Sequence, residues 1–172
     1  MFCFTILIHA RSYSAANQNV QAFNMATQQR LGAFKLPDGQ SVEFWRYVDD
    51  QTVAIVTSTS VLHWTVSGNQ PKKMFDRHDN LRGCKILNYE VSGDGKWLLV
   101  GGIKKGAGGG VEGRMQLYSV EKNVSQPLNG NAGVFGAISL PRGGPKAQVF
   151  CFAEKKPGAS PKVSQGRGEI QA

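Results

Sequence analysis

The chain has 172 residues, of which 41% are hydrophobic, and a formal net charge of +8 at pH 7. This length is typical of one domain with a buried core. Lysines and arginines are scattered along the chain, so its charge is compatible with nucleic acid, an anionic membrane surface or acidic peptides as partners and does not choose among them. No stretch approaches the about 18 consecutive apolar residues that a membrane-spanning helix needs.

The first 17 residues are the least typical part of the chain. The apolar run from Met1 to Ile8 is similar to a short signal-peptide core, but it lacks a basic start and a clear cleavage site. We therefore expect residues 1–17 to be an atypical leader. Within it, Phe4–Ile8 either takes the place of a strand or lies outside the fold.

The next segment, residues 18–40, predicts two strands, at 20–25 and 30–36, because it matches the last two strands of the four-strand unit that follows it. A complete meander of four strands follows in residues 41–82. Short polar turns separate its strands, which are expected at 43–47, 52–57, 61–66 and 72–75.

The same four-strand pattern repeats in residues 83–130, and an aromatic residue precedes a polar turn in each third strand: Phe23, Trp64 and Tyr118. The expected strands of this repeat are 84–89, 96–101, 115–120 and 124–128. The aromatic spacing grows from 41 to 54 residues, and the glycine-rich run between Lys104 and Gly113 accounts for the insertion. Units of about 40 residues with four antiparallel strands are typical of propeller blades. The sequence therefore predicts an all-β fold, a partial WD40-like β-propeller that is not closed.

Residues 131–156 predict a partial further blade, and the polar, turn-rich residues 157–172 a disordered tail. About three blades cannot close a ring, so we expect unpaired edges and a chain that is poorly soluble or self-associating. The apolar face of each strand should be largely buried. The residues expected on that face are Trp45, Val53, Ile55, Leu62, Trp64, Trp97, Leu99, Leu117 and Phe150.

The chain carries no recognisable catalytic or metal-binding signature, so we expect no enzyme activity and no cofactor. Three widely spaced cysteines, of which Cys84 and Cys151 are expected to be buried thiols, suggest neither a disulfide framework nor a zinc site. The histidines lack metal-ligand spacing; we expect His63 to be a hydrogen-bonded structural residue and His78 a turn residue. The glycine-rich run lacks the Gly-Lys-Ser/Thr signature and the helix of a phosphate loop and is interpreted as a loop between strands.

Four longer segments indicate one particular protein family. They are QPKKMFDRHDNLRGCKILNY, GKWLLVGGI, GRMQLYSVEKNVSQPLNG and QVFCFAEK. In this order and spacing they resemble the amino-terminal propeller of clathrin heavy chains, over residues 20–155. The resemblance implies a propeller of seven blades followed by a long α-solenoid leg, of which about three blades are present here.

The resemblance also implies a function. Clathrin propellers bind short leucine-rich acidic motifs of adaptor and accessory proteins, so the chain is expected to be part of a coat subunit in vesicle-mediated transport and endocytosis. Its expected location is cytoplasmic, on coated pits and coated vesicles, with membrane contact only through adaptors. No nucleic acid partner is expected, and other clathrin chains are partners only if the leg is present.

Two of the three peptide surfaces implied by the family are incomplete in this sequence. The clathrin-box groove between the first two blades retains Gln21, Phe23 and Arg30, whereas Gln28 stands where the family has a second lysine. The central site for tryptophan-containing motifs corresponds to three residues, of which the first replaces a glutamine: Lys85, Leu87 and Ile103.

The third surface lies between the fourth and fifth blades of the family's propeller and is the most intact. Lys122, Val124 and Gln126 match a basic, an apolar and a polar contact there. Such a surface suits leucine-rich acidic peptides, because apolar pockets accept leucines and cations attract acidic residues.

Two other functions remain open from the residues alone. A propeller of another family would use the same blade pattern with different grooves. A basic RNA-binding β domain would need aromatic residues interleaved with cations on an exposed sheet face. Trp45, Tyr47, Trp64 and Trp97 instead lie among aliphatic residues, which favours a role in the core.

Overall fold

The computed structural model describes residues 4–8, 19–68, 70–106, 109–139, 144 and 146–154. Apart from one 3₁₀ turn, η1 at Asp79–Leu81, the regular elements of these residues are β-strands. The all-β fold expected from the sequence is therefore confirmed. Within the described residues, no helix has the length and apolarity needed to cross a membrane.

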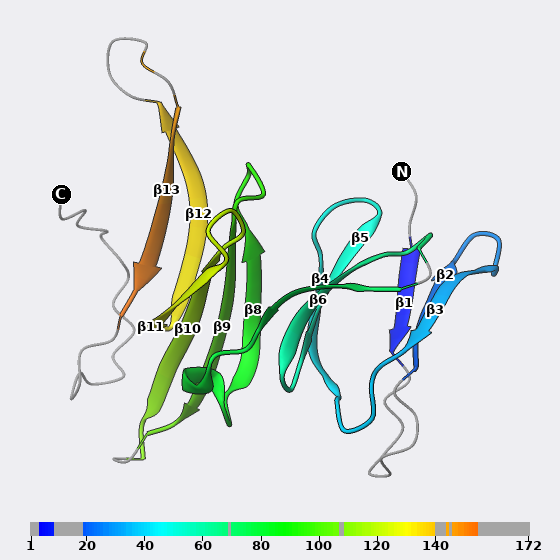
Figure 1. Ribbon diagram of the computed structural model, residues 1–172, viewed down its shortest axis with the longest axis horizontal. Helices are drawn as coiled ribbons and strands as arrows, with labels where there is room; N and C mark the ends of the chain where they lie inside the picture. Colours follow the sequence, from blue (N-terminus) through cyan, green and yellow to red (C-terminus); the bar gives the residue numbers. More distant parts are fainter. Residues whose placement is uncertain are drawn as a thin grey trace.

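The strands form four antiparallel sheets in chain order (Figure 1). The first sheet contains β1 (Phe4–Ile8), β2 (Asn19–Asn24) and β3 (Arg30–Lys35). The second contains β4 (Val42–Tyr47), β5 (Thr52–Thr57), β6 (Ser60–Thr65) and β7 (Lys72–Asp76). The third contains β8 (Lys85–Val91), β9 (Trp97–Lys105), β10 (Val111–Ser119) and β11 (Val124–Asn129). The fourth contains β12 (Ala132–Ser139) and β13 (Lys146–Ala153).

Strand β1 settles the role of the apolar segment near the start of the chain. Phe4–Ile8 pairs with β2 along its whole length, from Phe4 opposite Asn24 to Ile8 opposite Val20. This segment therefore takes the place of a strand. Of the expected leader, only these five residues are described. The expected tail at 157–172 lies outside the described residues.

The sheets are stacked, and the middle strands of the second and third sheets are buried on both faces. In β5, Val53 and Ile55 belong to an apolar cluster shared with the first sheet, and Ala54 and Val56 to one shared with the third. A third cluster around Leu99 of β9 joins the third sheet to the fourth. Because successive side chains of a strand point to opposite faces, a strand between two other sheets is apolar without interruption. This explains the runs Val53–Val56 and Leu98–Val100.

The first strands of consecutive sheets lie side by side, β4 against β8 and β8 against β12. We call this side of each sheet its inner edge and the opposite side its outer edge. Arg46 of β4 pairs with Glu90 of β8 and donates hydrogen bonds to Asn88 Oδ1 at 3.2 Å and Tyr89 O at 3.1 Å. Asn88 Nδ2 in turn donates to Gly133 O of β12 at 3.3 Å. These polar contacts join three sheets along their inner edges.

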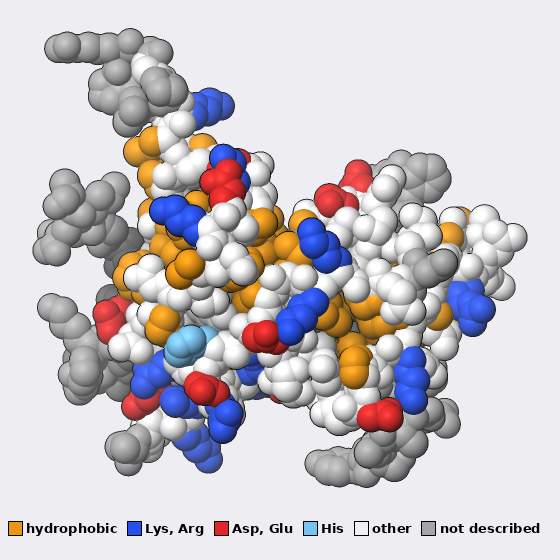
Figure 2. Space-filling view, in the orientation of Figure 1, with side chains coloured by type: hydrophobic (Ala, Val, Ile, Leu, Met, Phe, Trp, Pro, Cys, Tyr) orange, Lys and Arg blue, Asp and Glu red, His pale blue; other side chains and the backbone are white. Residues whose placement is uncertain are grey.

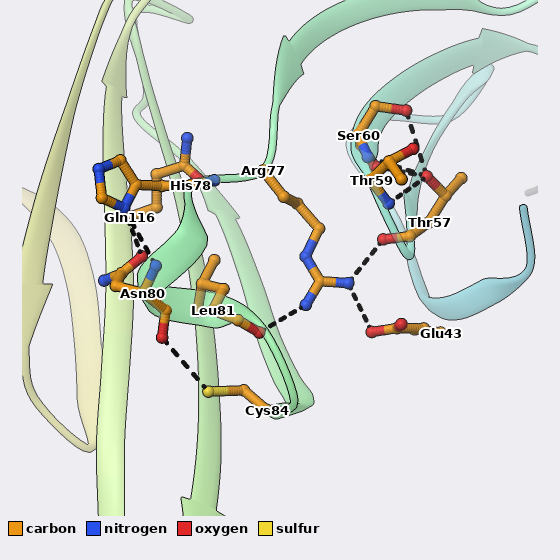
Figure 3. A network of polar contacts seen from close by, with 10 residues as sticks. All are labelled: Glu43, Thr57, Thr59, Ser60, Arg77, His78, Asn80, Leu81, Cys84 and Gln116. Carbon is orange, nitrogen blue, oxygen red and sulfur yellow. Dashed lines mark hydrogen bonds and ion pairs between the residues drawn. The ribbon is translucent and has the colours of Figure 1, made fainter.

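Arg77 anchors the segment that connects the second sheet to the third (Figure 3). Its side chain is only 5% exposed. Nη1 donates to Glu43 Oε2 at 2.6 Å and to Thr57 O at 2.7 Å, and Nη2 donates to Leu81 O at 2.9 Å. One guanidinium group thus satisfies acceptors from β4, from β5 and from η1.

The fully buried side chain of Gln116 on β10 holds the same connection from the third sheet. Its Oε1 accepts from His78 N at 2.8 Å, and its Nε2 donates to Asp76 O at 2.9 Å and to Ser125 Oγ at 2.8 Å. The side chain of His78 accepts from Asn80 N at the start of η1. The prediction that His78 is a turn residue is confirmed.

Most of the expected core is buried. The residues that were expected on the apolar faces and are buried are Val53, Ile55, Leu62, Trp64, Leu99 and Leu117. Trp97 and Phe150 are only partly buried, and the prediction for Trp45 is wrong because its side chain is 38% exposed. The neighbouring Tyr47, also placed in the core from the sequence, is 39% exposed.

The wrong burial predictions share one physical cause, which is the position of the residue's strand in the stack of sheets. Trp45 and Tyr47 lie on β4, an edge strand, and the sheet before it has three strands instead of four. Cys84 is buried as expected, but the prediction that Cys151 is buried is wrong. Cys151 pairs with Val134, which is itself 55% exposed, in the last described sheet of the stack. An apolar strand residue is buried only where another sheet covers its face.

Candidate peptide-binding surfaces

The third surface implied by the sequence lies at the outer edge of the third sheet. Lys122 is in the turn between β10 and β11, and Val124 and Gln126 are two residues apart on β11, so they share one face of this edge strand. Val124 is 58% exposed, and Lys122 and Gln126 are exposed as well. The structure thus places the three residues together and leaves them accessible.

Local hydrogen bonds fix the turn that carries Lys122. Asn123 has a positive φ of 53°, and its Oδ1 accepts from the hydroxyl of Tyr118 at 2.6 Å. Lys122 N donates to Ser119 Oγ at 3.3 Å. Asparagine tolerates the left-handed conformation better than most residues, which suits it to this position. The turn is therefore held by its own side chains rather than by a neighbouring sheet.

The charges around the turn leave Lys122 available. Glu121 pairs with Lys96, with 2.6 Å between Oε1 and Nζ, so this carboxylate is already neutralised. Among the described residues, Lys122 takes part in no ion pair. An acidic group of a ligand would meet a cation without an internal competitor.

Apolar side chains continue the same face toward the fourth sheet. Val124 and Gln126 lie opposite Ser119 and Leu117 of β10, and Leu117 belongs to the cluster that Leu128 and Phe150 partly cover. Figure 2 shows apolar side chains at the surface over this part of the molecule, where β12 and β13 lie. The fourth sheet has only β12 and β13 among the described residues. No further described strand of that sheet therefore covers the face of β11 that carries Val124 and Gln126.

The second surface also comes together in the structure. Lys85 of β8 and Ile103 of β9 are directly opposite each other, and Leu87 lies at the irregularity between Ile86 and Asn88. Leu87 is 46% exposed, Lys85 is exposed and Ile103 is partly buried. These residues lie near the inner edge, next to the start of β12, which contacts β8.

The residues of the first surface lie at the opposite end of the stack. Phe23 of β2 is directly opposite Arg30 of β3, and Gln21 is opposite Ala33. Gln21 and Phe23 are partly buried and alternate with Val20 and Ala22, which pack against the second sheet. The three residues therefore face away from the second sheet, and no sheet among the described residues covers them. Gln28, at the position of the family's second lysine, has a positive φ of 58° in the β2–β3 turn.

Titratable groups with shifted pKa values have structural roles. The Nε2 atom of His63 lies 2.7 Å from the hydroxyl of Tyr89 across the junction of the second and third sheets. Burial lowers the pKa of His63 to about 4; the nearby Asp49 acts to raise this pKa, and Lys72 acts to lower it further. Burial also raises the pKa of Tyr89. This confirms His63 as a hydrogen-bonded structural residue. Among the described residues, no group of three or more His, Cys, Asp or Glu side chains could hold a metal ion.

The glycine-rich run forms the connection between β9 and β10. Gly106 N donates to Gly110 O at 2.8 Å, and Gly109 has a positive φ of 77°. Residues 107 and 108 are not among those described. No helix follows the run, since β10 begins at Val111. The connection is shorter than the sequence predicts, because Lys104 and Lys105 belong to β9 and residues 111–113 to β10, so that only residues 106–110 lie between the strands.

Sequence reasoning missed the surroundings of the third surface. It did not identify Leu128 and Phe150 as the partly buried apolar neighbours of Leu117, nor the ion pair of Glu121 with Lys96. The alternation of Val124, Gln126 and Leu128 on β11 was the signal that could have added the apolar residue. The Lys96–Glu121 pair has no local signal, because it joins two different turns.

Comparison with known proteins connects the geometry to a family. The chain is 41% identical over 143 residues to clathrin heavy chain 2 of Homo sapiens and 40% identical over 139 residues to the clathrin heavy chain of Drosophila melanogaster. It is 33% identical over 154 residues to clathrin heavy chain 1 of Arabidopsis thaliana. These matches cover 83%, 80% and 87% of the chain.

The chain corresponds to a small part of these relatives, since the matches span 8%, 8% and 9% of their lengths. A scan against protein-family models finds no match. The stacked four-stranded sheets and the long matches agree, and they identify the sheets as propeller blades in an unclosed stack. The chain is homologous to the amino-terminal region of clathrin heavy chains.

Proposed function

We propose that the chain acts as a peptide-binding part of a vesicle coat subunit. Clathrin heavy chain homologues are structural and non-enzymatic, and their homology supports a coat role. The ligands would be short leucine-rich acidic motifs of adaptor and accessory proteins, and the place of action the cytoplasmic face of coated pits and vesicles. A membrane would be reached through the adaptors.

The observation that carries this proposal is the exposed row of Lys122, Val124 and Gln126 at the outer edge of the third sheet. An extended peptide can lie along β11, because edge strands present unpaired backbone groups. Leucines of the peptide would pack beside Val124, and an acidic residue would approach the unpaired Lys122. The surfaces around Phe23 and Leu87 are weaker candidates, since Gln21, Phe23 and Ile103 are partly buried, whereas Lys122, Val124 and Gln126 are all exposed.

The proposal predicts how two variants of this surface bind a leucine-rich acidic peptide. Lys122→Glu should weaken binding several-fold and flatten its salt dependence, because an exposed ion pair contributes about 1 kcal/mol or less and the reversal adds repulsion. Gln126→Ala should also weaken binding, but with little change in salt dependence because glutamine is uncharged. Calorimetric titration at two salt concentrations measures both effects.

Lys73→Glu is the matched control for this experiment. Lys73 is exposed on β7, the outer strand of the second sheet, so its replacement changes the net charge equally but away from β11. It should bind the peptide like the parent chain at the higher salt concentration. If Lys122→Glu and Gln126→Ala both bind like the parent, the peptide does not use this surface.

A further inference from the structure

The hairpin of β9 and β10 extends beyond the neighbouring strands of the third sheet (Figure 1). β8 and β11 pair with it no further than Ile103 and Arg114. β9 and β10 continue to pair beyond these positions, to Lys105 opposite Val111. We call the described residues within 104–112 the basic ribbon. Because no neighbouring strand of the sheet flanks it, the ribbon is open to a ligand on the side of β11.

The basic ribbon carries two lysines that have no carboxylate partner among the described residues. Its own acidic residue, Glu112, pairs with Arg114, with 2.7 Å between Oε2 and Nη2. Lys104 and Lys105 take part in no ion pair with a described residue. Lys104 is partly buried, whereas Lys105 is exposed. The sequence of the ribbon has no aromatic residue on which a nucleic acid base could stack, so Lys105 suits an acidic peptide better.

Lys105 lies on the same face of the third sheet as the third candidate surface. Residues directly opposite each other in an antiparallel pair share a face, and so do residues an even number of positions apart on one strand. Lys105 is opposite Val111, Val111 lies six residues from Leu117, and Leu117 is opposite Gln126. Val111 is 59% exposed. This face therefore has an accessible cation at each end, Lys105 at one and Lys122 at the other.

The two cations are separated by almost the whole length of β10. From Ser119, opposite Val124, to Val111, opposite Lys105, β10 advances by eight residues. An antiparallel strand rises about 3.4 Å per residue, so this separation is about 27 Å. An extended peptide along β11 therefore needs about eight residues between a group beside Lys122 and a group beside Lys105.

We propose that the peptide ligand of the third surface carries two acidic groups about eight residues apart, one on each side of its leucines, and that Lys105 binds one group while Lys122 binds the other. This inference rests on the proposed function and names the class of peptide that the surface selects. The leucines pack beside Val124, between the two cations. A peptide with a different spacing reaches only one lysine, so the spacing provides specificity that one exposed cation does not.

Three peptides with the same leucine-rich centre test the spacing. The first carries an acidic pair at each end, about eight residues apart, and each of the other two has one of these pairs replaced by serines. The doubly acidic peptide should bind the 172-residue chain several-fold tighter than either singly acidic peptide at low salt, because exposed ion pairs are individually weak. The difference should disappear at high salt, where exposed charges are screened. Calorimetric titration measures the three affinities.

Charge reversal at each lysine assigns the two contacts. Lys105→Glu should weaken binding of the doubly acidic peptide and of one singly acidic peptide several-fold. Lys122→Glu should weaken binding of the doubly acidic peptide and of the other singly acidic peptide. Lys73→Glu, on the outer strand of the second sheet, changes the net charge equally and is the matched control. It should preserve the tighter binding of the doubly acidic peptide.

Two results would overturn this inference. One is equal binding of the three peptides by the parent chain at low salt, and the other is an effect of Lys105→Glu no larger than that of Lys73→Glu. If Lys122→Glu nevertheless weakens binding, the proposed function stands and only the contact with Lys105 is wrong. If Lys122→Glu also has no effect on any of the peptides, the proposed function is wrong as well.

Discussion

Arg77 holds the joint between the second and third sheets through three hydrogen bonds. It is 5% exposed, and its partner Glu43 is 32% exposed. Its three hydrogen bonds reach residues as far as 34 positions away in the sequence. Arginine suits this place because its planar guanidinium group donates several hydrogen bonds in a fixed geometry and remains charged.

Replacing Arg77 by methionine should strongly destabilise the chain. Methionine fills similar space but leaves Glu43 without its partner and removes one donor each from the carbonyl groups of Thr57 and Leu81, of which Leu81 O still accepts from Cys84 N. Breaking a largely buried ion pair in this way costs about 2–4 kcal/mol of unfolding free energy. Urea denaturation followed by circular dichroism measures the loss.

Arg82→Met is the matched control, because Arg82 also pairs with an acidic residue, Asp79, but both side chains are more than 80% exposed, at 84% and 83%. Its cost should stay within about 0.5 kcal/mol. Equal stability of the two variants would show that Arg77 does not hold the joint.

At the scale of elements, the sheets are held together by apolar faces with a few polar contacts between them. β5 and β9 are buried on both faces, and the inner strands are linked by Arg46 and Asn88. The hydrogen bond between His63 of β6 and Tyr89 of β8 crosses the same junction and contains an imidazole that acid can protonate. The junction of the second and third sheets should therefore respond to acid.

Protonation of His63 at acid pH should lower the unfolding free energy of the chain. Its pKa is about 4 in the folded chain, below the ordinary value of 6.5, because burial disfavours the imidazolium. The unfolded chain therefore binds a proton below pH 6.5 that the folded chain does not bind until about pH 4. The unfolding free energy should be constant above about pH 7 and fall by about 1 kcal/mol toward pH 5, allowing for partial exposure of the ring.

Urea denaturation at pH 7 and pH 5 measures this slope, and the window lies above the range in which ordinary carboxylates titrate. His63→Gln should remove most of it, because glutamine can still bond to Tyr89 but does not titrate. A slope that survives in His63→Gln would assign the acid sensitivity to other groups.

Strand positions were predictable from the sequence, whereas burial at the ends of the stack was not. Thr52–Thr57 was predicted with the bounds that β5 has, because a run of β-branched residues between polar turns is a local signal. Trp45 and Cys151 were misplaced because their burial depends on whether another sheet covers β4 or β13. Arg77 was missed as an anchor because its acceptors are distant in sequence. The resemblance to the family named the residues of each candidate surface, but it could not predict how far these residues are exposed to solvent.

At the scale of the whole stack, no other sheet of the described residues covers the outward faces of the first and fourth sheets. The first end carries Gln21, Phe23 and Arg30, and the other carries the outward face of β12 and β13. A closed ring would cover both, since each blade buries the apolar face of the next. The outer edge of the third sheet, with Lys122, Val124 and Gln126, lies between these ends and is accessible in the stack as it stands.

The measurement that tests the account most directly is an amide NMR titration of the isotopically labelled chain with a leucine-rich acidic peptide. Signals of β10, the following turn and β11, including Lys122, Val124 and Gln126, should shift together and saturate at the same peptide concentration. The signals around Phe23 and Leu87 should stay unchanged. Shifts gathered at either of those two surfaces, or no saturable shifts on the third sheet, would contradict the account.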